Sequence, residues 1–343
     1  MNATAKVIGL DIAKNVFVAV GRDAHGKIVL KKTLHRDDVS RFFATMSPTS
    51  IGIESCAGSH YWARKLLVQG HDVKLIAAQH TRAYVSGNKN DTNDAAAIAE
   101  IRSRESTKYV PINTEAQQDL QMLHRARRAL MVERNAMIYR IRAFAGEYGQ
   151  VFSIGVAKFR SGFAAWLVNE NNGLSGSAMC TFNDLIAQLN DKEMRIESYD
   201  ERIKLAAKSD ERAKRLMEVP GIGTLTATAV LASLADPHHF GSGRDFSANL
   251  GLIPREHSSG GKQRLYGITK RGDVYLRTLL IHGARSALRC AGEKQDRLLR
   301  WAVKLALKRG NNVAAVALAN KLARVIWALL AHGRNYVPTW SKA

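Results

Sequence analysis

The chain has 343 residues, 46% of them hydrophobic, and its 51 Lys and Arg outnumber its 30 Asp and Glu to give a net charge of +21. This hydrophobic content excludes a disordered chain, and no uninterrupted apolar run approaches the roughly 18 residues of a membrane span. The positive charge favours a polyanionic partner, because Lys and Arg displace the counterions around phosphates. A membrane surface is the competing interpretation, but no amphipathic segment rich in Trp or Phe supports it.

The cysteines indicate a reducing environment. Cys56, Cys180 and Cys290 are odd in number, widely spaced and in no metal-ligand pattern. The N-terminus also lacks the order of features that marks a signal peptide. We therefore expect a cytoplasmic protein without structural zinc.

The first 110 residues alternate between strand and helix patterns. Strands are predicted over 7–12, 16–20, 27–30, 50–53 and 72–76, and helices over 38–46 and 61–68. Antiparallel strands followed by crossover helices are typical of a mixed α/β fold of the RNase H-like (RuvC-like) type. We predict such a domain over residues 1–110.

Four carboxylates stand out in this region. Asp91 and Asp94 are three residues apart where a polar loop becomes an Ala-rich helix, so both would lie on one helix face. Asp11 and Glu54 lie in or at the end of apolar strands that should be neighbours, where an unpaired carboxylate is costly. Such hard oxygen ligands suit Mg²⁺, with Mn²⁺ as a substitute.

Each pair also has an ordinary structural interpretation. Asp91 could be a helix N-cap, with Asp94 favoured in the first turn by the helix dipole. Asp11 and Glu54 could each be solvent-facing acids at strand ends. The fold should bring all four together, and that convergence favours the metal site.

Residues 111–209 are predicted to form a helical segment. A capping box at residues 114–117 opens one long helix with apolar and Arg-rich sides, and a second runs over about 183–207. The connection, 150–182, is predicted to be irregular because it is rich in Asn, Gly and Ser. The pair indicates an antiparallel hairpin or a dimerising coiled coil, with packing inside one domain as the alternative.

Residues 210–335 are predicted to form a mostly helical domain. Gly221 and Gly223, in the run VPGIG, belong to a helix-hairpin-helix signature whose backbone amides can bind a phosphate; a tight turn without ligand is the alternative. Further on, a serine of the Gly/Ser loop that contains Ser258 and Ser259 lies near several cations, where it could attack a phosphodiester. A loop that only binds phosphate is the alternative. The candidate nucleic-acid-binding cations are Lys262, Arg264, Lys270, Arg271 and Arg277.

Five runs of sequence resemble one known family. They are GLDIAKNVF, GIESCAGSHYWAR, NKNDTNDAAAIAE, VPGIG and GLIPREHSSGGKQRLYGITKRGDVYLRTLLIHGA. They resemble the insertion-sequence transposases that have a RuvC-like DEDD domain and a C-terminal serine domain. That family includes the Piv-type invertases and the bridge-RNA-guided recombinases. The resemblance covers about residues 5–147 and 210–335.

The resemblance implies specific roles. Asp11, Glu54, Asp91 and Asp94 would be the DEDD tetrad that binds Mg²⁺, and Ser259, which precedes a glycine, would be the nucleophile, although Ser258 stands next to it. It further implies DNA partners at the element ends and target, a structured guide RNA, and a dimer or tetramer.

We therefore predict a DNA transposase or recombinase that exchanges strands through a phosphoserine intermediate. A Mg²⁺-dependent nuclease of the Holliday-junction-resolvase type is one alternative, and a nucleic-acid-binding protein without catalysis is another.

Overall fold

The computed structural model describes residues 5–85, 88, 90–104, 107–234, 236–292 and 296–338. The chain divides into two compact units, residues 1–115 and residues 116–343. Each unit is described by itself. The predicted division of the second unit at residue 209 stays a prediction.

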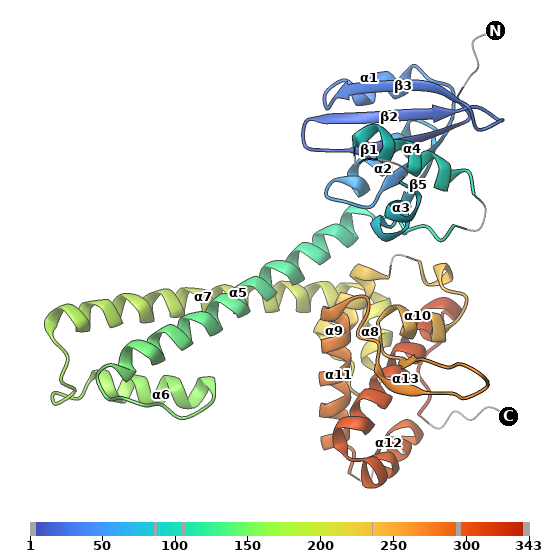
Figure 1. Ribbon diagram of the computed structural model, residues 1–343. Helices are drawn as coiled ribbons and strands as arrows, with labels where there is room; N and C mark the ends of the chain where they lie inside the picture. The colour runs from blue at the N-terminus through green and yellow to red at the C-terminus, as the bar shows by residue number, and fades with distance from the viewer. Residues whose placement is uncertain are drawn as a thin grey trace. The chain divides into compact units, whose positions relative to one another are not determined.

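The first unit is built on a five-stranded sheet in the order β3-β2-β1-β4-β5 (Figure 1). Its strands are β1 Val7–Ile12, β2 Val16–Arg22, β3 Ile28–His35, β4 Ser50–Glu54 and β5 Asp72–Ile76. The first three pair antiparallel, whereas β4 pairs parallel with β1 and β5. This confirms the predicted mixed α/β architecture and is consistent with an RNase H-like domain.

Helices cover both faces of this sheet. They are α1 Val39–Ala44, α2 Ser59–Val68, α3 Ala78–Tyr84 and α4 Asp91–Arg102. Phe43 and Trp62, from α1 and α2, pack with the buried side chains of one face. On the other face Val18 and Val20 pack against Ala95 of α4. The short α3 was not predicted, because its sequence has no apolar periodicity.

Three helices begin the second unit. They are α5 Glu115–Gly146, α6 Val156–Leu167 and α7 Gly176–Ser209. Arg127 of α5 bonds to Asp200 of α7, and Glu133 bonds to Lys192, so the two long helices run antiparallel. This fits the predicted hairpin. A coiled coil is not confirmed.

The prediction that residues 150–182 are irregular was wrong. They contain α6 and the start of α7. Phe159, Phe163 and Trp166 recur at helical spacing on α6 and pack against Phe182 and Met137 in one apolar cluster. The local Asn, Gly and Ser signals therefore mark only the turns, and burial of aromatic side chains stabilises the helix between them.

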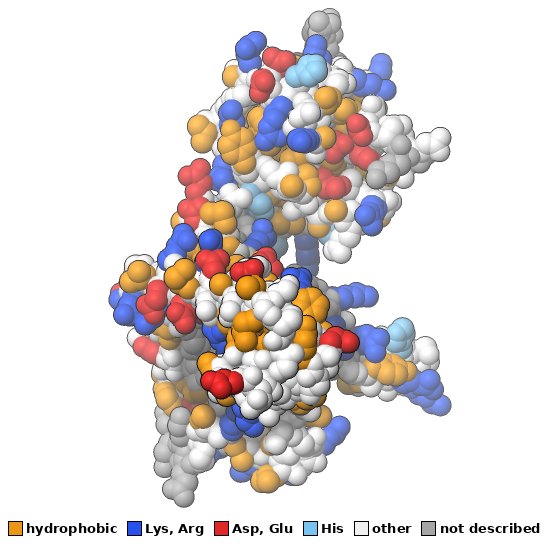
Figure 2. All heavy atoms as spheres, turned by 90° about the vertical axis from the view of Figure 1, so that its left-hand side faces the viewer, with side chains coloured by type: hydrophobic (Ala, Val, Ile, Leu, Met, Phe, Trp, Pro, Cys, Tyr) orange, Lys and Arg blue, Asp and Glu red, His pale blue; other side chains and the backbone are white. Residues whose placement is uncertain are grey.

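Apolar side chains also remain on the outside of this hairpin. Tyr139, Val151 and Ile154 are 71%, 85% and 94% exposed, and Phe144, which was predicted on the apolar face, is 45% exposed. Figure 2 shows apolar side chains gathered at the hairpin end that faces the viewer. A surface of this kind is compatible with the predicted interaction element, which stays a prediction.

The rest of the second unit is mostly helical, as predicted. It contains α8 Glu211–Met217, α9 Thr224–Ser233, η1 Pro237–His239, α10 Gly243–Asn249, α11 Val274–Arg289, α12 Arg297–Arg309 and α13 Asn311–His332. A two-stranded sheet of β6 Pro254–Glu256 and β7 Leu265–Ile268 interrupts it.

The last helix, α13, is long and apolar enough to span a membrane by composition alone. Leu318, Leu322 and Ile326 are fully buried on it, in the same apolar cluster as α9 and α11. These contacts account for its apolar composition, since the central helix of a helical unit is apolar on several sides.

Candidate active site

In the first unit, β1 and α4 touch with no side chain between them. A Cβ added to Gly9 would lie 2.0 Å from the carbonyl oxygen of Ala95 and 2.4 Å from the amide nitrogen of Ala99. Gly52 of β4 is paired with Gly9, and a Cβ there would lie 3.1 Å from the Ile98 side chain. Glycine on the strands and alanine on the helix therefore allow α4 to lie directly on the sheet.

This packing places the acids at the start of α4. Alternate residues of a strand face the same side, so Asp11 faces the α4 side as Gly9 does, one step nearer the C-terminal end of β1. Glu54 ends the neighbouring parallel strand β4. Asp91 is the first residue of α4, and Asp94 lies in its first turn. The sequence pairs therefore converge at one corner of the fold.

The pKa of Asp11 reflects the presence of the other three carboxylates. Burial, and then the charges of Asp91, Asp94 and Glu54, raise the pKa of Asp11 from 3.8 to about 6. Each of the three other carboxylates acts on Asp11, so the four side chains share one region of negative potential. A bound cation would relieve this repulsion.

Asn90, rather than Asp91, caps α4. Asn90 is extended, with φ −153° and ψ 156°, and its side-chain oxygen accepts a hydrogen bond of 2.7 Å from the backbone amide of Asn93. The interpretation of Asp91 as the N-cap was therefore wrong. Because Asn90 satisfies the helix end, Asp91 and Asp94 are not required for capping.

The carboxylates are near one another but are not closed around one point. Among the described residues, no three His, Cys, Asp or Glu side chains form a group that could hold a metal ion. Carboxylate oxygens are nevertheless the ligands that Mg²⁺ prefers, so the residues present fit this ion chemically. Closing the site would require the side chains to rotate.

In the second unit, Ser259 lies at a corner of a tight turn in the β6–β7 hairpin. The amide of Lys262 donates a 3.1 Å hydrogen bond to the carbonyl oxygen of Ser259. Between them, Gly260 and Gly261 have φ values of 55° and 74°. Two successive positive φ values are those of a type I′ turn, which glycine adopts readily. Ser259 is exposed there.

The two adjacent serines differ in their contacts. The hydroxyl of Ser258 donates to a carboxylate oxygen of Glu256 at 2.5 Å and accepts from the amide of Arg264 at 3.3 Å. Within the described part of the chain, the hydroxyl of Ser259 makes no hydrogen bond. Ser258 is therefore held by its own hairpin, whereas the Ser259 hydroxyl is free to meet a substrate.

Gly221 lies in the turn between α8 and α9 with φ 87°. A Cβ there would lie 2.6 Å from the carbonyl oxygen of Gly283 on α11, and a Cβ on Gly283 would lie 2.0 Å from that of Gly221. The two glycines therefore allow the turn to pack against α11. Gly223 is the exposed N-cap residue of α9. The predicted helix-hairpin-helix function is not confirmed by this packing.

Most of the predicted cationic residues are on the surface. Lys262, Arg264, Lys270 and Arg271 are exposed. Arg277 is instead only 7% exposed, and its guanidinium donates to the carbonyl oxygens of Leu250 and Arg271, at 3.0 and 2.7 Å. This placement argues against the predicted role of Arg277 in nucleic-acid binding, because its charge is used to hold the turn before α11.

Two family models match this chain, one in each unit for most of its length. A DEDD-type IS110 transposase domain matches residues 8–149, and a region described as transposase IS116/IS110/IS902 family matches residues 213–299. A probable family 20 transposase of Pseudomonas aeruginosa is 43% identical over 335 residues, which are 96% of this chain and 98% of the relative. The chain belongs to the IS116/IS110/IS902 family of transposases.

Other relatives of this transposase chain are named after insertion sequences. The transposase for insertion sequence element IS1111A of Coxiella burnetii is 42% identical, over 96% of this chain and 91% of its own length. The transposase for insertion sequence element IS1328 of Yersinia enterocolitica is 38% identical, over 95% of this chain and 97% of its own length. Transposases act on DNA, and DEDD-type transposase domains are generally metal-dependent. The predicted transposase family is thus confirmed, while the individual residue roles remain predictions.

Sequence reasoning missed two features of this transposase. Cys56 lies beside the acids, and its pKa is raised to about 11 by burial and by the charges of Glu54 and Asp11. The second is a polar network around His124 in the second unit, which joins residues more than a hundred positions apart. No local pattern marks the burial of Cys56 or the partners of His124, because both depend on how the chain folds.

Proposed function

We propose that this transposase cleaves and rejoins DNA by metal-dependent phosphoryl transfer, with Asp11, Glu54, Asp91 and Asp94 as the metal ligands. The observation that most supports this is the raised pKa of Asp11, to which all three other acids contribute. Mg²⁺ held there would orient the scissile phosphate and stabilise its developing charge. The proposal places the reaction in the prokaryotic cytoplasm, at the element ends and the target DNA.

We assign the nucleophile to Ser259. Its oxygen forms a bond to phosphorus while the bond from phosphorus to one DNA oxygen breaks, and the serine proton passes to solvent or to the departing oxygen. The product is a phosphoserine–DNA link that keeps a phosphodiester bond for the later strand exchange. The free, exposed hydroxyl of Ser259, against the bonded hydroxyl of Ser258, supports this choice.

The surface cations of the second unit would bind the nucleic acid. Lys262 and Arg264 lie within and beside the hairpin turn that carries Ser259, and Lys270 and Arg271 follow β7. Their charge would hold phosphates without reading the base sequence. Gly223, at the N-terminus of α9, would add backbone amides. Selection of the site by a structured guide RNA completes the proposal.

The decisive experiment uses a DNA substrate with an element end and traps covalent adducts in denaturing gels, with purified protein, Mg²⁺ and the non-coding RNA transcribed beside the gene. We expect a DNA adduct with the wild type and with Ser258→Ala, and no adduct with Ser259→Ala or without divalent metal. Adducts with Ser259→Ala and none with Ser258→Ala would move the nucleophile to Ser258.

A second outcome separates strand exchange from simple cleavage. Metal-dependent cutting that yields only free ends, unchanged by Ser259→Ala, would indicate a nuclease of the resolvase type instead. Binding without cutting, unchanged by Asp11→Asn, would indicate a protein that acts only by binding.

Mixing two inactive variants tests whether the acids and the serine come from different copies of the chain. Asp11→Asn retains Ser259, and Ser259→Ala retains the acids. If one copy supplies the acids and another the serine in a dimer or tetramer, the mixture forms adducts although neither variant does alone. A mixture that stays inactive, while both variants bind DNA normally, would contradict this arrangement.

A further inference from the structure

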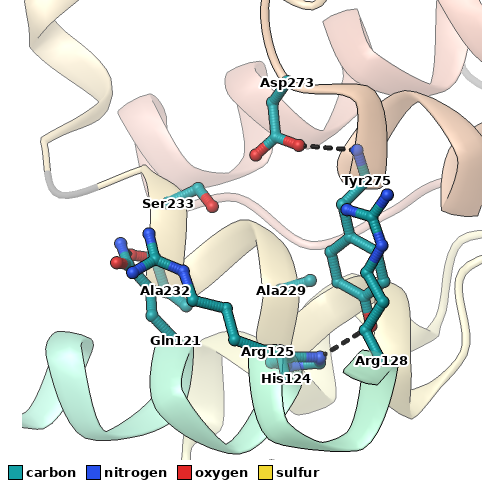
Figure 3. Close-up of a pocket in the computed structure, with 9 residues that line it drawn as sticks. All are labelled: Gln121, His124, Arg125, Arg128, Ala229, Ala232, Ser233, Asp273 and Tyr275. Carbon is teal, nitrogen blue, oxygen red and sulfur yellow. Dashed lines mark hydrogen bonds between the residues drawn. The ribbon is translucent and has the colours of Figure 1, made fainter. Parts of the chain in front are cut away.

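The second unit contains a pocket that is separate from the candidate catalytic residues. It has a volume of about 360 Å³ and is formed by α5, α9 and the start of α11. Its lining residues, drawn in Figure 3, include Arg125 and Arg128 of α5, Ser233 of α9, and Asp273 and Tyr275 at the start of α11. None of the candidate catalytic residues lines it.

A hydrogen-bonded chain fixes the floor of this pocket. The hydroxyl of Thr228 donates to the carbonyl oxygen of Thr224 at 2.7 Å, so it accepts the 3.0 Å bond from Nε2–H of His124. The other ring nitrogen, Nδ1, therefore accepts the 3.0 Å bond from the hydroxyl of Tyr275. His124 is 3% exposed, and burial and the charge of Arg127 lower its pKa to about 4. The imidazole is thus neutral and contributes no charge to the pocket.

The two arginines that line the pocket have no acidic partner. Among the described residues, no ion pair within 4.0 Å includes Arg125 or Arg128. By contrast Arg127, between them in sequence, bonds to Asp200. The guanidinium of Arg128 lies 5.5 Å from the centre of the Tyr275 ring, which fixes its orientation. In Figure 3 the side chains of Arg125 and Arg128 flank the open space of the pocket.

Two acceptor oxygens at the pocket already have donors within the protein. Asp273 caps α11, and one of its carboxylate oxygens accepts from the amides of Tyr275 and Leu276 at 2.8 and 3.0 Å. The carbonyl oxygen of Ala232, at the C-terminal end of α9, accepts from the side-chain amide of Gln121 at 2.8 Å. Among the described residues, the lining donors without a hydrogen bond are the two guanidiniums and the exposed hydroxyl of Ser233.

We propose that Arg125 and Arg128 bind one backbone phosphate of a nucleic acid in this pocket, with Ser233 as a further donor. Guanidinium groups are suited to phosphate oxygens because they donate two hydrogen bonds in a planar fork. This inference rests on the proposed function only in taking a polynucleotide as the ligand. It gives the helical unit an anchoring point on α5, separate from the hairpin that carries Ser259.

The test measures equilibrium binding by fluorescence anisotropy, with the full chain in EDTA so that catalysis plays no part. The probes are a labelled random-sequence DNA duplex and a labelled RNA duplex. The test variant is Arg125→Gln combined with Arg128→Gln. The matched control is Arg140→Gln, an exposed arginine on the same helix outside the pocket.

We expect the double variant to weaken binding severalfold and to lower the slope of log affinity against log salt by about 0.9, the value for one phosphate on B-DNA. Arg140→Gln should leave both unchanged. A double variant with wild-type affinity and slope for both probes would overturn the proposal. Because adduct formation is not measured, this result does not depend on the assignment of Ser259.

A second measurement locates the phosphate. Ser233→Cys, in a background where Cys56, Cys180 and Cys290 are replaced by Ser, is mixed with DNA or RNA that carries a pyridyl disulfide tethered to one backbone phosphate, so that the introduced thiol displaces pyridinethione by thiol–disulfide exchange. We expect a disulfide at residue 233, lost when Arg125 and Arg128 are both Gln, and none at the exposed control Ser177→Cys. The probe that is trapped identifies the source of the phosphate. Trapping of neither probe, or equal trapping at residue 177, would overturn the proposal.

Discussion

Asp11 in the first unit and His124 in the second are both partly or largely buried, and both favour their neutral forms. The pKa of Asp11 is raised to about 6 by burial and three acidic neighbours, whereas the pKa of His124 is lowered to about 4 chiefly by burial. His124 has both ring nitrogens hydrogen-bonded, so its neutral form is satisfied. Asp11 is surrounded by charges of its own sign, and no cationic side chain among the described residues contributes to its pKa.

The difference between Asp11 and His124 helps to distinguish a candidate binding site from a structural hydrogen-bond network. A polar group whose hydrogen bonds are all satisfied within the protein rigidifies its surroundings. A cluster of like charges without a counter-charge costs stability unless a ligand compensates it, and strained electrostatics of this kind are characteristic of functional sites. This criterion favours the acids as a candidate cation site, and His124 as a structural support of the pocket that Arg125 and Arg128 line.

The largest expected effect comes from Asp11→Asn. We expect adduct formation to fall by more than about a hundredfold, since direct ligands matter more than the outer-shell groups whose loss costs about 10- to 100-fold. Binding of DNA in EDTA should be unchanged. Adduct yield and anisotropy, measured on the same preparation, check this; a parallel loss of both would show that the fold, and not the chemistry, was damaged.

Gly9→Ala tests whether close packing of α4 creates the acid cluster. The added methyl group would meet the backbone of Ala95 and Ala99, so we expect a loss of about 1–3 kcal/mol in stability, typical of overpacking. Displacement of α4 should also lower the pKa of Asp11 towards its ordinary value. Urea unfolding and NMR titration of the carboxyl measure the two effects. Gly146→Ala, where an added Cβ meets nothing within 4 Å, is the control and should show neither.

The pH dependence of stability should differ in sign between the units. The folded pKa of Asp11 lies above the unfolded value, so the stability that it contributes is present below pH 3.8 and is lost as the pH rises through about 6. In metal-free buffer, Asp11→Asn should therefore raise the melting temperature at pH 8 and not at pH 3.8. Mg²⁺ should stabilise the wild type at pH 8 and leave the variant unchanged; equal stabilisation of both would contradict a metal site at Asp11.

For His124 the sign is reversed. Its folded pKa lies below the unfolded value of 6.5, so the stability that it contributes is present above pH 6.5 and is lost as the pH falls through about 4. As the pH falls from 6.5 to about 4, the melting temperature of His124→Gln should therefore fall less than that of the wild type. An equal fall in both proteins would show that other groups, not His124, govern the acid sensitivity of this unit.

The smallest expected effect is that of Tyr275→Phe. It removes the hydroxyl that donates to His124 but keeps the ring beside Arg128. We expect a loss of about 1 kcal/mol in stability, the usual contribution of one hydrogen bond. Nucleic-acid binding should weaken less than in the double arginine variant. Urea unfolding and anisotropy on one preparation check both; a binding loss as large as that of the double variant would place the hydroxyl itself on the phosphate.

Several features could be predicted from the sequence because they are encoded locally. The alternating strands, the crossover helices and the two long helices follow from apolar periodicity and turn residues, and the structure contains them. The acids could be selected because a carboxylate within or at the end of an apolar strand is costly unless it is paired, and because the predicted fold brings these strands to the start of the helix.

Local sequence patterns were poor guides to the structure where the burial of side chains had the larger effect. Residues 156–167 form a helix although polar and glycine-rich turns surround them, because Phe159 and Phe163 have an apolar cluster to enter. Arg277 has the charge of a phosphate ligand but lies buried against two carbonyl oxygens. The sequence showed its charge, and only the tertiary structure showed where that charge is used.

The sequence by itself determined which residue types could form each site, because periodicity and turn chemistry act over a few residues. The tertiary structure decided which of them share a space. Gly9 and Gly52 let α4 lie on the sheet, and that contact brings Asp91 and Asp94 to Asp11 and Glu54. Through-space repulsion and close backbone packing depend on residues far apart in the chain, so no local pattern could reveal them.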